Sequence, residues 1–568
     1  MESRENESIS KIRSEREKWE REHEAEFAKE RKETFLSLSG IPIKRIYTPE
    51  DLQEKEFDYL KDLGFPGDNP YTRGISATGY RSALWRMSQA AALGTPEECN
   101  ELWKGQFAAG LNQLQIQYDL PTQYGLDPDD PRTEGEVGRV GVSMFSLRDW
   151  ETAFEGIDFS KISVSQVSSA TASIATACYL ALAERRGYNL SQLRGACQND
   201  ILKEYVARGV YIFPPKPSLR LAIDVISYCV QLGMEYFNPI QVMTYQYVER
   251  GATPVHEIAL GLAAAFTYLS SVAKRGLNVE SIAPSVQIVP AYYHTGFFEQ
   301  IAKLRALRKI YTRILKEQFR VKNPKAMKVN LFSSFGGREI YRQQYLNNIA
   351  RNAIGGLAAA LAGSQVIALR PYDEMFGIPT DESITNAIRT QQVIAYETDI
   401  ADVVDPLAGS YFVEWLTSEI EERVLKELKV IEDVGGFVKC IEEGYIAQQL
   451  AKDAYEWEKK FQRKEILRVG VNIFTTEEEE EKPARICRGD PKVEQLRIKA
   501  LNELRKNRDD LAVNRALQAV KKAAATESSP SNNMMVPIIE AVKAYATYGE
   551  ICDILRGVWG EFTAPKVT

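Results

Sequence analysis

Residues 162–167 read ISVSQV, a short run in which apolar and polar side chains alternate. Alternation with a period of two is typical of a β-strand. Ile162 and Val164 then share one face of this strand, while Ser163 and Ser165 share the other. A longer helical pattern follows, so the run begins one strand-plus-helix unit.

Seven further short runs rich in strand-forming residues are each followed by a longer helical pattern: Leu114–Tyr118, Leu193–Cys197, Pro239–Thr244, Val286–Val289, Lys328–Ser333, Gln365–Leu369 and Ala401–Val404. Eight strand-plus-helix units predict an α/β fold of the (β/α)8 TIM barrel type. A doubly wound open sheet is the alternative. The Gly-rich dinucleotide fingerprint that such a sheet can carry is missing from this sequence.

One face of several predicted strands is polar, and the residues concerned are Gln115, Gln117, Ser163, Ser165, Gln241, Ser285, Gln287 and Asn330. Helices cover the outer face of a barrel strand, so the polar face points inward. A lumen lined by Ser, Gln and Asn is costly unless something polar fills it. We therefore expect an elongated, hydrogen-bonding ligand, or water, along the barrel axis; the alternative is that one or two strands are shifted in register.

Composition excludes several classes of function. The formal net charge of -7 on 568 residues argues against a general nucleic-acid binder. No apolar stretch predicts a membrane span or a signal peptide. The seven scattered Cys indicate reduced thiols and a cytoplasmic location, and three well-separated His without a Cys pair indicate no zinc site.

Shifts in composition divide the chain into five segments: 1–100, a helical N-terminal arm and barrel entry; 101–410, the barrel; 411–472, a helical extension; 473–490, an acidic linker; and 491–568, a helical C-terminal tail. The arm is charged and reads as helical over residues 10–35. The tail reads as two helices, 491–524 and 535–556, joined by a Ser/Pro/Asn-rich connection.

Several blocks of this sequence resemble one enzyme family: RGISATGYRS (73–82), QNDILKEYVARGVYIFPPKPS (198–218), YDEMFGIPT (372–380), ADVVDPLAGSYFVE (401–414), VGVNIF (469–474) and ATYGEICDILRGVWG (546–560). They resemble the large, substrate-binding subunit of adenosylcobalamin-dependent acyl-CoA mutases, which act on methylmalonyl-CoA, isobutyryl-CoA or 2-hydroxyisobutyryl-CoA. The first block looks most like the 2-hydroxyisobutyryl-CoA branch, as does the absence of an attached cobalamin domain. The resemblance implies a radical rearrangement of an acyl-CoA carbon skeleton, with the pantetheine arm running through the polar lumen.

The resemblance also implies a partner. The family binds cobalt through the His of a D-x-H-x-x-G motif, and none of His23, His256 and His294 lies in such a motif. We therefore expect adenosylcobalamin to be held together with a separate small subunit, in a hetero-oligomer with this chain. The N-terminal arm and the C-terminal tail are the candidates for contacting that subunit.

Five residues match functional positions of the family. Arg208 matches the Arg that pairs with the free carboxylate of methylmalonyl-CoA, which favours a carboxylated acyl group. Gln198 matches a Gln near the thioester, and Tyr245 matches the active-site Tyr. Glu374 matches the Glu that holds the adenosyl ribose, and Gly337 matches a Gly near the corrin.

Other positions depart from the family pattern. Gln246 replaces the His that hydrogen-bonds the thioester carbonyl, so it donates a hydrogen bond but no charge. Ala90 replaces a larger residue at the acyl-specificity position, which favours a bulky acyl group. Further replacements lie beside the cofactor (Phe332, Ser334 and Arg370) and at positions where the family has CoA-binding arginines (Ala83, Ser88 and Ser285).

These residues leave three hypotheses. The first is a mutase large subunit for a bulky or carboxylated acyl-CoA, with Tyr245, Gln246 and Arg208 as its catalytic residues. Its substrate would be bound by Ala90, Gln117, Ser163, Ser165, Gln198, Arg208, Gln241 and Gln287, and its cofactor by Ser334, Gly337, Arg370 and Glu374. The second is a non-catalytic scaffold subunit, and the third is a barrel enzyme for a substrate other than CoA.

Overall fold

The strands of the computed structural model are all parallel within the described residues, which are 2–88, 94–108, 113–476, 490 and 492–564. One sheet has the order β1-β9-β8-β7-β6 and the other the order β2-β3-β4-β5. Their bounds are β1 (Arg86–Met87), β2 (Gln113–Gln117), β3 (Ser163–Val167), β4 (Gly195–Cys197), β5 (Phe237–Asn238), β6 (Ile240–Val242), β7 (Val286–Ile288), β8 (Asn330–Ser334) and β9 (Val366–Ala368). The predicted α/β class with parallel strands is confirmed.

The two sheets follow one another where β5 meets β6. Pro239 alone separates these strands, and because proline has no N–H it interrupts the ladder of hydrogen bonds. The pairing resumes when the Gln241 N–H donates to the Gln198 carbonyl oxygen at 3.3 Å. From β2 to β9 the strands therefore lie side by side in chain order, and β1 pairs beyond β9.

One predicted strand is wrong. Residues 401–404 form turns and bends after helix α14 (Asp381–Glu397). Asp405, directly after them, has φ +54° and forms an ion pair with Arg305 at 2.5 Å, so the segment is held as a loop. The place beside β9 belongs instead to β1, where Arg86 pairs with Val366. Two residues are too short to show any periodicity, which explains why β1 was missed.

The register confirms the shared polar face. Gln115 pairs with Ser165, whereas Leu114 pairs with Val164 on the opposite face and both of these are fully buried. In the other sheet Gln241 pairs with Gln287, which in turn pairs with Asn330. Side chains at paired positions of neighbouring strands lie on the same face. Polar residues that are far apart in the sequence therefore form continuous rows.

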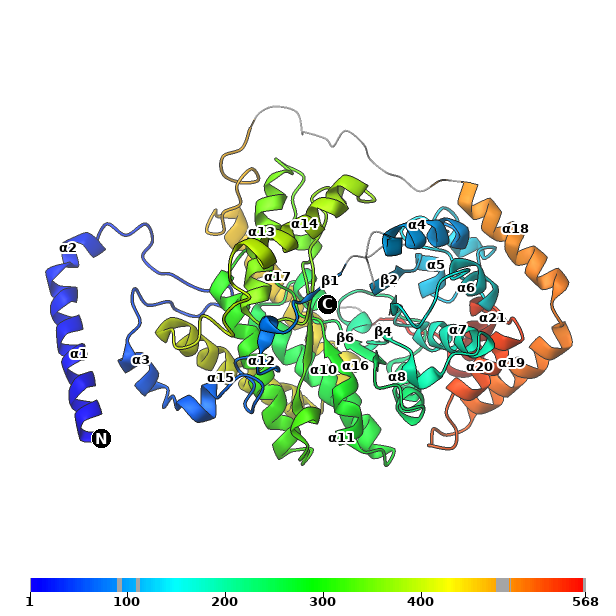
Figure 1. The fold of residues 1–568 in the computed structure, drawn as a ribbon, viewed down its shortest axis with the longest axis horizontal. Helices are drawn as coiled ribbons and strands as arrows, with labels where there is room; N and C mark the ends of the chain where they lie inside the picture. The colour runs from blue at the N-terminus through cyan, green and yellow to red at the C-terminus, as the bar shows by residue number, and fades with distance from the viewer. Residues whose placement is uncertain (1, 89–93, 109–112, 477–489, 491, 565–568) are drawn as a thin grey trace.

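Helices cover the apolar face of the strands (Figure 1). Their bounds are α4 (Pro96–Ala108), α6 (Leu147–Ala153), α7 (Ala172–Arg185), α8 (Pro215–Gln231), α9 (Tyr245–Glu249), α10 (Pro254–Lys274), α12 (Phe297–Glu317), α13 (Asn347–Leu361), α15 (Tyr411–Val434), α16 (Phe437–Glu442) and α17 (Tyr445–Gln462). In the part of the chain that the structure describes, α10 is the one helix long and apolar enough to cross a membrane. Its most apolar window is 72% buried inside the protein, as expected for a core helix that packs on β6 and α12.

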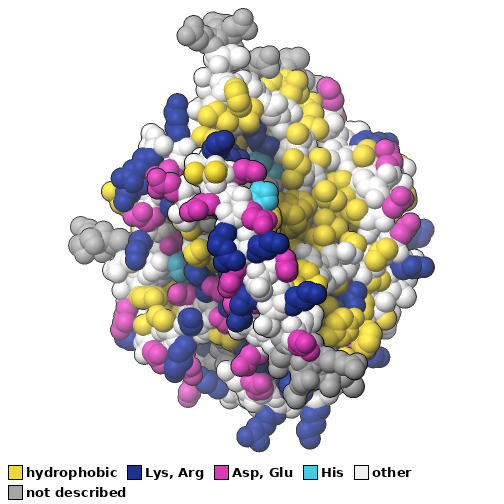
Figure 2. Space-filling model, turned by 90° about the vertical axis from the view of Figure 1, so that its left-hand side faces the viewer, with side chains coloured by type: hydrophobic (Ala, Val, Ile, Leu, Met, Phe, Trp, Pro, Cys, Tyr) yellow, Lys and Arg dark blue, Asp and Glu magenta, His cyan; other side chains and the backbone are white. Residues whose placement is uncertain are grey.

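The N-terminal arm stands beside the rest of the protein (Figure 1) and is helical as far as Phe27, whereas residues 28–35, which were also predicted to be helical, form turns and irregular structure. It consists of α1 (Glu2–Glu22) and α2 (Glu24–Phe27), and ion pairs from Arg13 and Arg16 to Glu50 tie it to α3 (Pro49–Glu54). Seen from this side, acidic and basic side chains alternate over the front of the molecule, and hydrophobic side chains gather next to them (Figure 2).

The C-terminal tail contains four helices rather than the two predicted: α18 (Lys492–Asn507), α19 (Asp510–Ala525), α20 (Met535–Lys543) and α21 (Tyr548–Trp559). Capping residues cause both additional breaks. The Asp509 carboxylate accepts hydrogen bonds from the first turn of α19, and Thr547 forms a capping box with Glu550 at the start of α21. The tail packs on α7 and α8, at the side of the β2–β5 sheet (Figure 1). The predicted linker 473–490 lies almost entirely outside the described residues.

Gly195 is required where β3 and β4 approach each other. Its φ is +150°, and a Cβ atom there would lie 1.9 Å from the Val164 carbonyl oxygen. We expect Gly195→Ala to lower the free energy of unfolding by about 3 kcal/mol. Gly105→Ala in α4 is the control, because a Cβ there meets nothing within 4 Å and Ala favours a helix. Urea denaturation measures both; equal effects of the two substitutions would contradict this prediction.

His256 clamps three helices together. Its Nδ1 lies 2.5 Å from Asp453 on α17, and its Nε2 lies 3.8 Å from Glu427 on α15. Burial lowers the pKa of His256, but the hydrogen bonds and charges of both carboxylates outweigh burial and raise this pKa to about 9.

Because that pKa exceeds the value of about 6.5 for an unfolded His, the clamp stabilises the fold fully below about pH 6.5 and loses its contribution as the pH rises through 9. We expect His256→Gln to cost about 2 kcal/mol at pH 6 and much less at pH 10. Thermal unfolding across this range is the measurement, with His23→Gln as the exposed control. A cost that is independent of pH would contradict the clamp.

Candidate functional site

Eight of the predicted site residues lie at one edge of the two sheets. Because neighbouring strands are parallel, their carboxyl ends lie at the same edge, where the chemistry of such folds is usually found. The residues that follow strand ends are Gln198 and Arg208 after β4, Tyr245 and Gln246 after β6, Gly337 after β8, and Arg370 and Glu374 after β9, while Ser334 is the last residue of β8. The others lie within strands: Gln117, Ser163, Ser165, Gln241 and Gln287. Ala90 lies outside the described residues.

Gln198 is fully buried, and neither polar atom of its side-chain amide has a hydrogen-bond partner among the described residues. The Ser165 hydroxyl, on the neighbouring strand β3 and on the same polar face, also has no partner among the described residues. Leaving a buried amide unpaired costs about 1–3 kcal/mol. This arrangement suits a polar ligand that passes along the face, with Gln198 supplying one donor and one acceptor.

Other polar residues of the face already satisfy each other. The Gln241 amide Nε2 donates to Gln287 Oε1 at 2.6 Å, and both side chains are buried. Gln117 and Ser163 are half-buried at the two ends of their strands. Gln166, which the alternation places on the opposite face, is buried with both amide atoms unpaired in the described structure, and we have no physical account of it.

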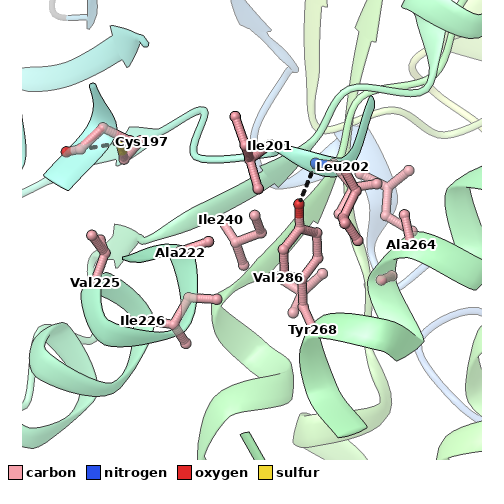
Figure 3. Packing of buried hydrophobic residues seen from close by; sticks show 14 of the residues in the cluster. Cys197, Ile201, Leu202, Ala222, Val225, Ile226, Ile240, Ala264, Tyr268 and Val286 are labelled. Carbon is pink, nitrogen blue, oxygen red and sulfur yellow. Dashed lines mark hydrogen bonds between the residues drawn. The ribbon is translucent and has the colours of Figure 1, made fainter. Parts of the chain in front are cut away.

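The turn after β4 is tied to the core through Tyr268 of α10 (Figure 3). The Tyr268 hydroxyl donates to Asp200 at 2.8 Å and accepts from the Leu202 N–H at 3.1 Å. The second oxygen of Asp200 accepts from the Met243 N–H at 2.9 Å. Burial raises the pKa of Asp200 to about 6, even though Lys203 and these hydrogen bonds oppose the rise. These three hydrogen bonds thus fix the backbone that leads from Gln198 to Arg208.

Arg208 lies beside a buried ion pair that the sequence did not reveal. Its Nη1 donates to Glu204 Oε1 at 3.4 Å, and Glu204 also pairs with Lys203 and accepts from the Val210 N–H. Lys203 and Glu204 are completely buried, whereas 21% of the Arg208 side chain is exposed. Burial would raise the pKa of Glu204, but the two cations lower it overall. Glu204 therefore stays ionised, while part of the Arg208 side chain remains accessible.

Tyr245 and Gln246 are neighbours at the start of α9. The Gln246 Nε2 donates to the Tyr245 hydroxyl at 3.1 Å, and its Oε1 has no partner in the described part of the chain. The Tyr245 N–H donates to the Val289 carbonyl, which fixes the backbone against β7. The Tyr245 hydroxyl and the Gln246 amide thus form one hydrogen-bonded pair, which has a free acceptor at Gln246 Oε1 in the described structure.

Arg370 and Glu374 form a second polar group after β9. Arg370 donates from Nη1 to Glu374 Oε1 at 3.1 Å and from Nε to the Phe335 carbonyl at 2.7 Å. The charges of Glu374, the largest cause, and of Glu249 outweigh burial and raise the pKa of Arg370. Arg370 therefore contacts Glu374 directly and lies near Glu249 and the Tyr245–Gln246 pair.

Glu249 also lies near Arg370, and the sequence did not predict it as a site residue. It accepts hydrogen bonds from the Tyr293 hydroxyl at 2.7 Å and from the Arg338 N–H at 3.1 Å. A Cβ on Gly336 would lie 1.8 Å from Glu249, whereas a Cβ on Gly337 would meet nothing closer than 3.8 Å. Gly336 is thus the sterically required glycine, and Gly337 presents exposed backbone. The one signal was the position of Glu249, one helical turn after Tyr245.

The site residues therefore form two groups, one on each sheet. Gln117, Ser163, Ser165, Gln198 and Arg208 belong to the β2–β5 sheet, and the remaining described residues belong to the other. The Gln241–Gln198 backbone hydrogen bond joins the groups.

Comparison with known proteins identifies the family. The sequence model of the family described as "Methylmalonyl-CoA mutase" matches residues 36–561. The 2-hydroxyisobutanoyl-CoA mutase large subunit of Aquincola tertiaricarbonis is 39% identical over 564 residues, which cover 98% of each chain. The methylmalonyl-CoA mutases of Rhizobium meliloti and Escherichia coli are 35% and 34% identical and cover 93% of this chain and 73% and 72% of their own lengths. This protein belongs to the methylmalonyl-CoA mutase family.

Proposed function

We propose that this chain is the large, substrate-binding subunit of an adenosylcobalamin-dependent mutase that rearranges the carbon skeleton of an acyl-CoA. Family membership supports the reaction class, and the similarity to a large subunit over 98% of both chains supports a separate small subunit. We also propose that the two sheets close between β1 and β2 into the predicted barrel. The division into five segments and the cytoplasmic location remain our proposals.

The observation that carries this proposal is the buried, unpaired amide of Gln198 at the carboxyl edge. A thioester and its pantetheine arm carry carbonyl and amide groups in a line, which matches a row of side-chain donors and acceptors. Gln246 supplies a further N–H donor for the thioester carbonyl. Since Gln carries no proton that titrates near pH 7, it orients and polarises this carbonyl without donating a proton.

The residues of the second group fit the adenosyl part of the cofactor. Glu374 is partly exposed and uses one carboxylate oxygen for Arg370, and no bond to its other oxygen is found among the described residues. That oxygen suits a ribose hydroxyl, and the exposed backbone at Gly337 allows a flat group to approach. When bound, adenosylcobalamin supplies the radical chemistry of the rearrangement. Glu374 and Arg370 would hold its adenosyl part, Ser334 lies beside them, and the small subunit would provide the cobalt ligand.

Arg208 would select the acyl group. Its partly exposed side chain suits a carboxylate, because arginine donates two parallel hydrogen bonds in a fixed geometry. We therefore propose a carboxylated acyl-CoA as the substrate class, with a bulky acyl chain if Ala90 lines the same pocket.

Calorimetric titration of the purified chain with acyl-CoA esters tests the proposed function. We expect esters to bind and free CoA to bind more weakly, in the absence and presence of a cobalamin-loaded small subunit. Gln198→Leu should raise the Kd of every ester by roughly tenfold, since a buried hydrogen bond is worth about 1–1.5 kcal/mol. Gln448→Leu, at an exposed position on α17, is the matched control. No binding by any ester under both conditions would refute a mutase and favour the scaffold hypothesis.

The proposed role of Arg208 gives a second prediction. Arg208→Gln should raise the Kd for methylmalonyl-CoA by roughly ten- to hundredfold, because a charge-assisted hydrogen bond is worth about 1.5–3 kcal/mol. The Kd for isobutyryl-CoA, which has no free carboxylate, should change less than twofold. Arg139→Gln, at an exposed arginine, controls for charge. An equal loss for both esters would exclude Arg208 as the carboxylate partner.

A further inference from the structure

The chain that follows α21 contacts the segment that carries Arg208. The Phe562 ring packs edge-on against the rings of Tyr205 and Tyr211, with centroids 5.0 and 5.2 Å away. These two tyrosines stack on each other at 5.0 Å, on either side of Arg208 in the sequence. The Phe562 N–H also donates to the Ile212 carbonyl at 3.0 Å. We call residues 205–213 the Arg208 loop. Both ends of this loop contact Phe562 of the tail.

The end of helix α21, which precedes Phe562 in the chain, also contacts the Arg208 loop. Trp559 packs edge-on against Phe213 with centroids 5.3 Å apart. Arg556 donates to the Tyr124 carbonyl at 2.7 Å, and the Tyr124 hydroxyl donates to the Gly209 carbonyl at 3.0 Å. Tyr124 therefore connects the tail to Gly209, the residue next to Arg208.

Within the loop itself, little holds the Arg208 side chain. Its hydrogen bond to Glu204 is long, at 3.4 Å, and Gly209 has φ +91°, a conformation in which glycine is freer than other residues. Recognition of a carboxylate by arginine depends on geometry, so the guanidinium must be presented in one orientation. The aromatic contacts of Tyr205 and Tyr211 with Phe562 hold the two ends of this turn, in addition to the bonds that Glu204 accepts from the Gly209 and Val210 N–H groups.

We propose that the tail segment Arg556–Phe562 is a positioning element for acyl-group selection, and that Phe562 acts through the Arg208 loop without touching the substrate. This inference rests on the proposed role of Arg208 in binding a substrate carboxylate. Phe562 is the informative residue, because it lies beyond the last helix and is half-buried, so the helices do not depend on it.

The test is Phe562→Ala in the full chain, with Phe562→Tyr as the conservative variant. Hydrogen exchange of the amides of residues 205–213 should become about tenfold faster in Phe562→Ala and stay unchanged elsewhere. The Kd for methylmalonyl-CoA should rise roughly fivefold, while that for isobutyryl-CoA should change less than twofold. Phe562→Tyr should restore both values. Tyr545→Ala is the control, since this tail ring lies against Arg148 and Arg185 and does not contact the loop.

The double variant with Arg208→Gln separates the possible failures. If the tail acts through Arg208, the double variant should discriminate between the esters no worse than Arg208→Gln alone. If Arg208→Gln does not discriminate, the carboxylate assignment fails, and the exchange rates alone decide whether the tail orders the loop. If Arg208→Gln discriminates but Phe562→Ala changes neither exchange nor selectivity, the inference about the tail is overturned. Equal weakening of both esters by Phe562→Ala would also overturn it.

Discussion

Parallel pairing of strands in chain order is the constraint on which the rest of this structure depends. Each crossover lays a helix on one face of the strands, so that face is mostly apolar, with Gln166 as an exception, and the opposite face carries most of the Gln, Ser and Asn. The same pairing brings every carboxyl end to one edge. Residues as distant in sequence as Gln198 and Glu374 are thereby placed in one site by backbone geometry, before any side-chain contact is made.

The local parts of this arrangement are predictable from sequence because they follow from periodicity. Alternation located seven of the strands and the polar face, on which the structure pairs Gln241 with Gln287. The strand predicted at 401–404 was wrong because the ion pair of Asp405 with Arg305, a contact between distant residues, overrides local propensity. The short β1 strand exists only through its pairing with β9. Family resemblance named Tyr245, Arg370 and Glu374, which the structure brings together, but neither resemblance nor periodicity showed Glu249 or the Lys203–Glu204 pair.

The buried Lys203–Glu204 ion pair also shows that the site lowers the stability of the fold locally. Removing two charges from water is unfavourable unless their geometry and hydrogen bonds are nearly ideal, so such pairs rarely add net stability. Here the pair supplies a fixed anion next to Arg208, which keeps this arginine near the edge of the sheet. Stability is given up locally, and the extensive apolar packing of α10, α12 and α15 offsets that loss elsewhere.

The docking of the tail on α7 has a consequence for the order in which the protein is assembled. The Trp150 indole N–H meets the Tyr548 hydroxyl across 398 intervening positions of sequence. The apolar surface of α7 that α20 covers is translated in the first third of the chain, yet its cover is among the last segments to leave the ribosome. The helices that pack on the β6–β9 half, α10, α12, α13 and α15, are all translated by residue 434, before the tail. The nascent chain therefore carries an exposed hydrophobic surface through most of its synthesis, which makes this half the aggregation-prone one and the natural client of a chaperone.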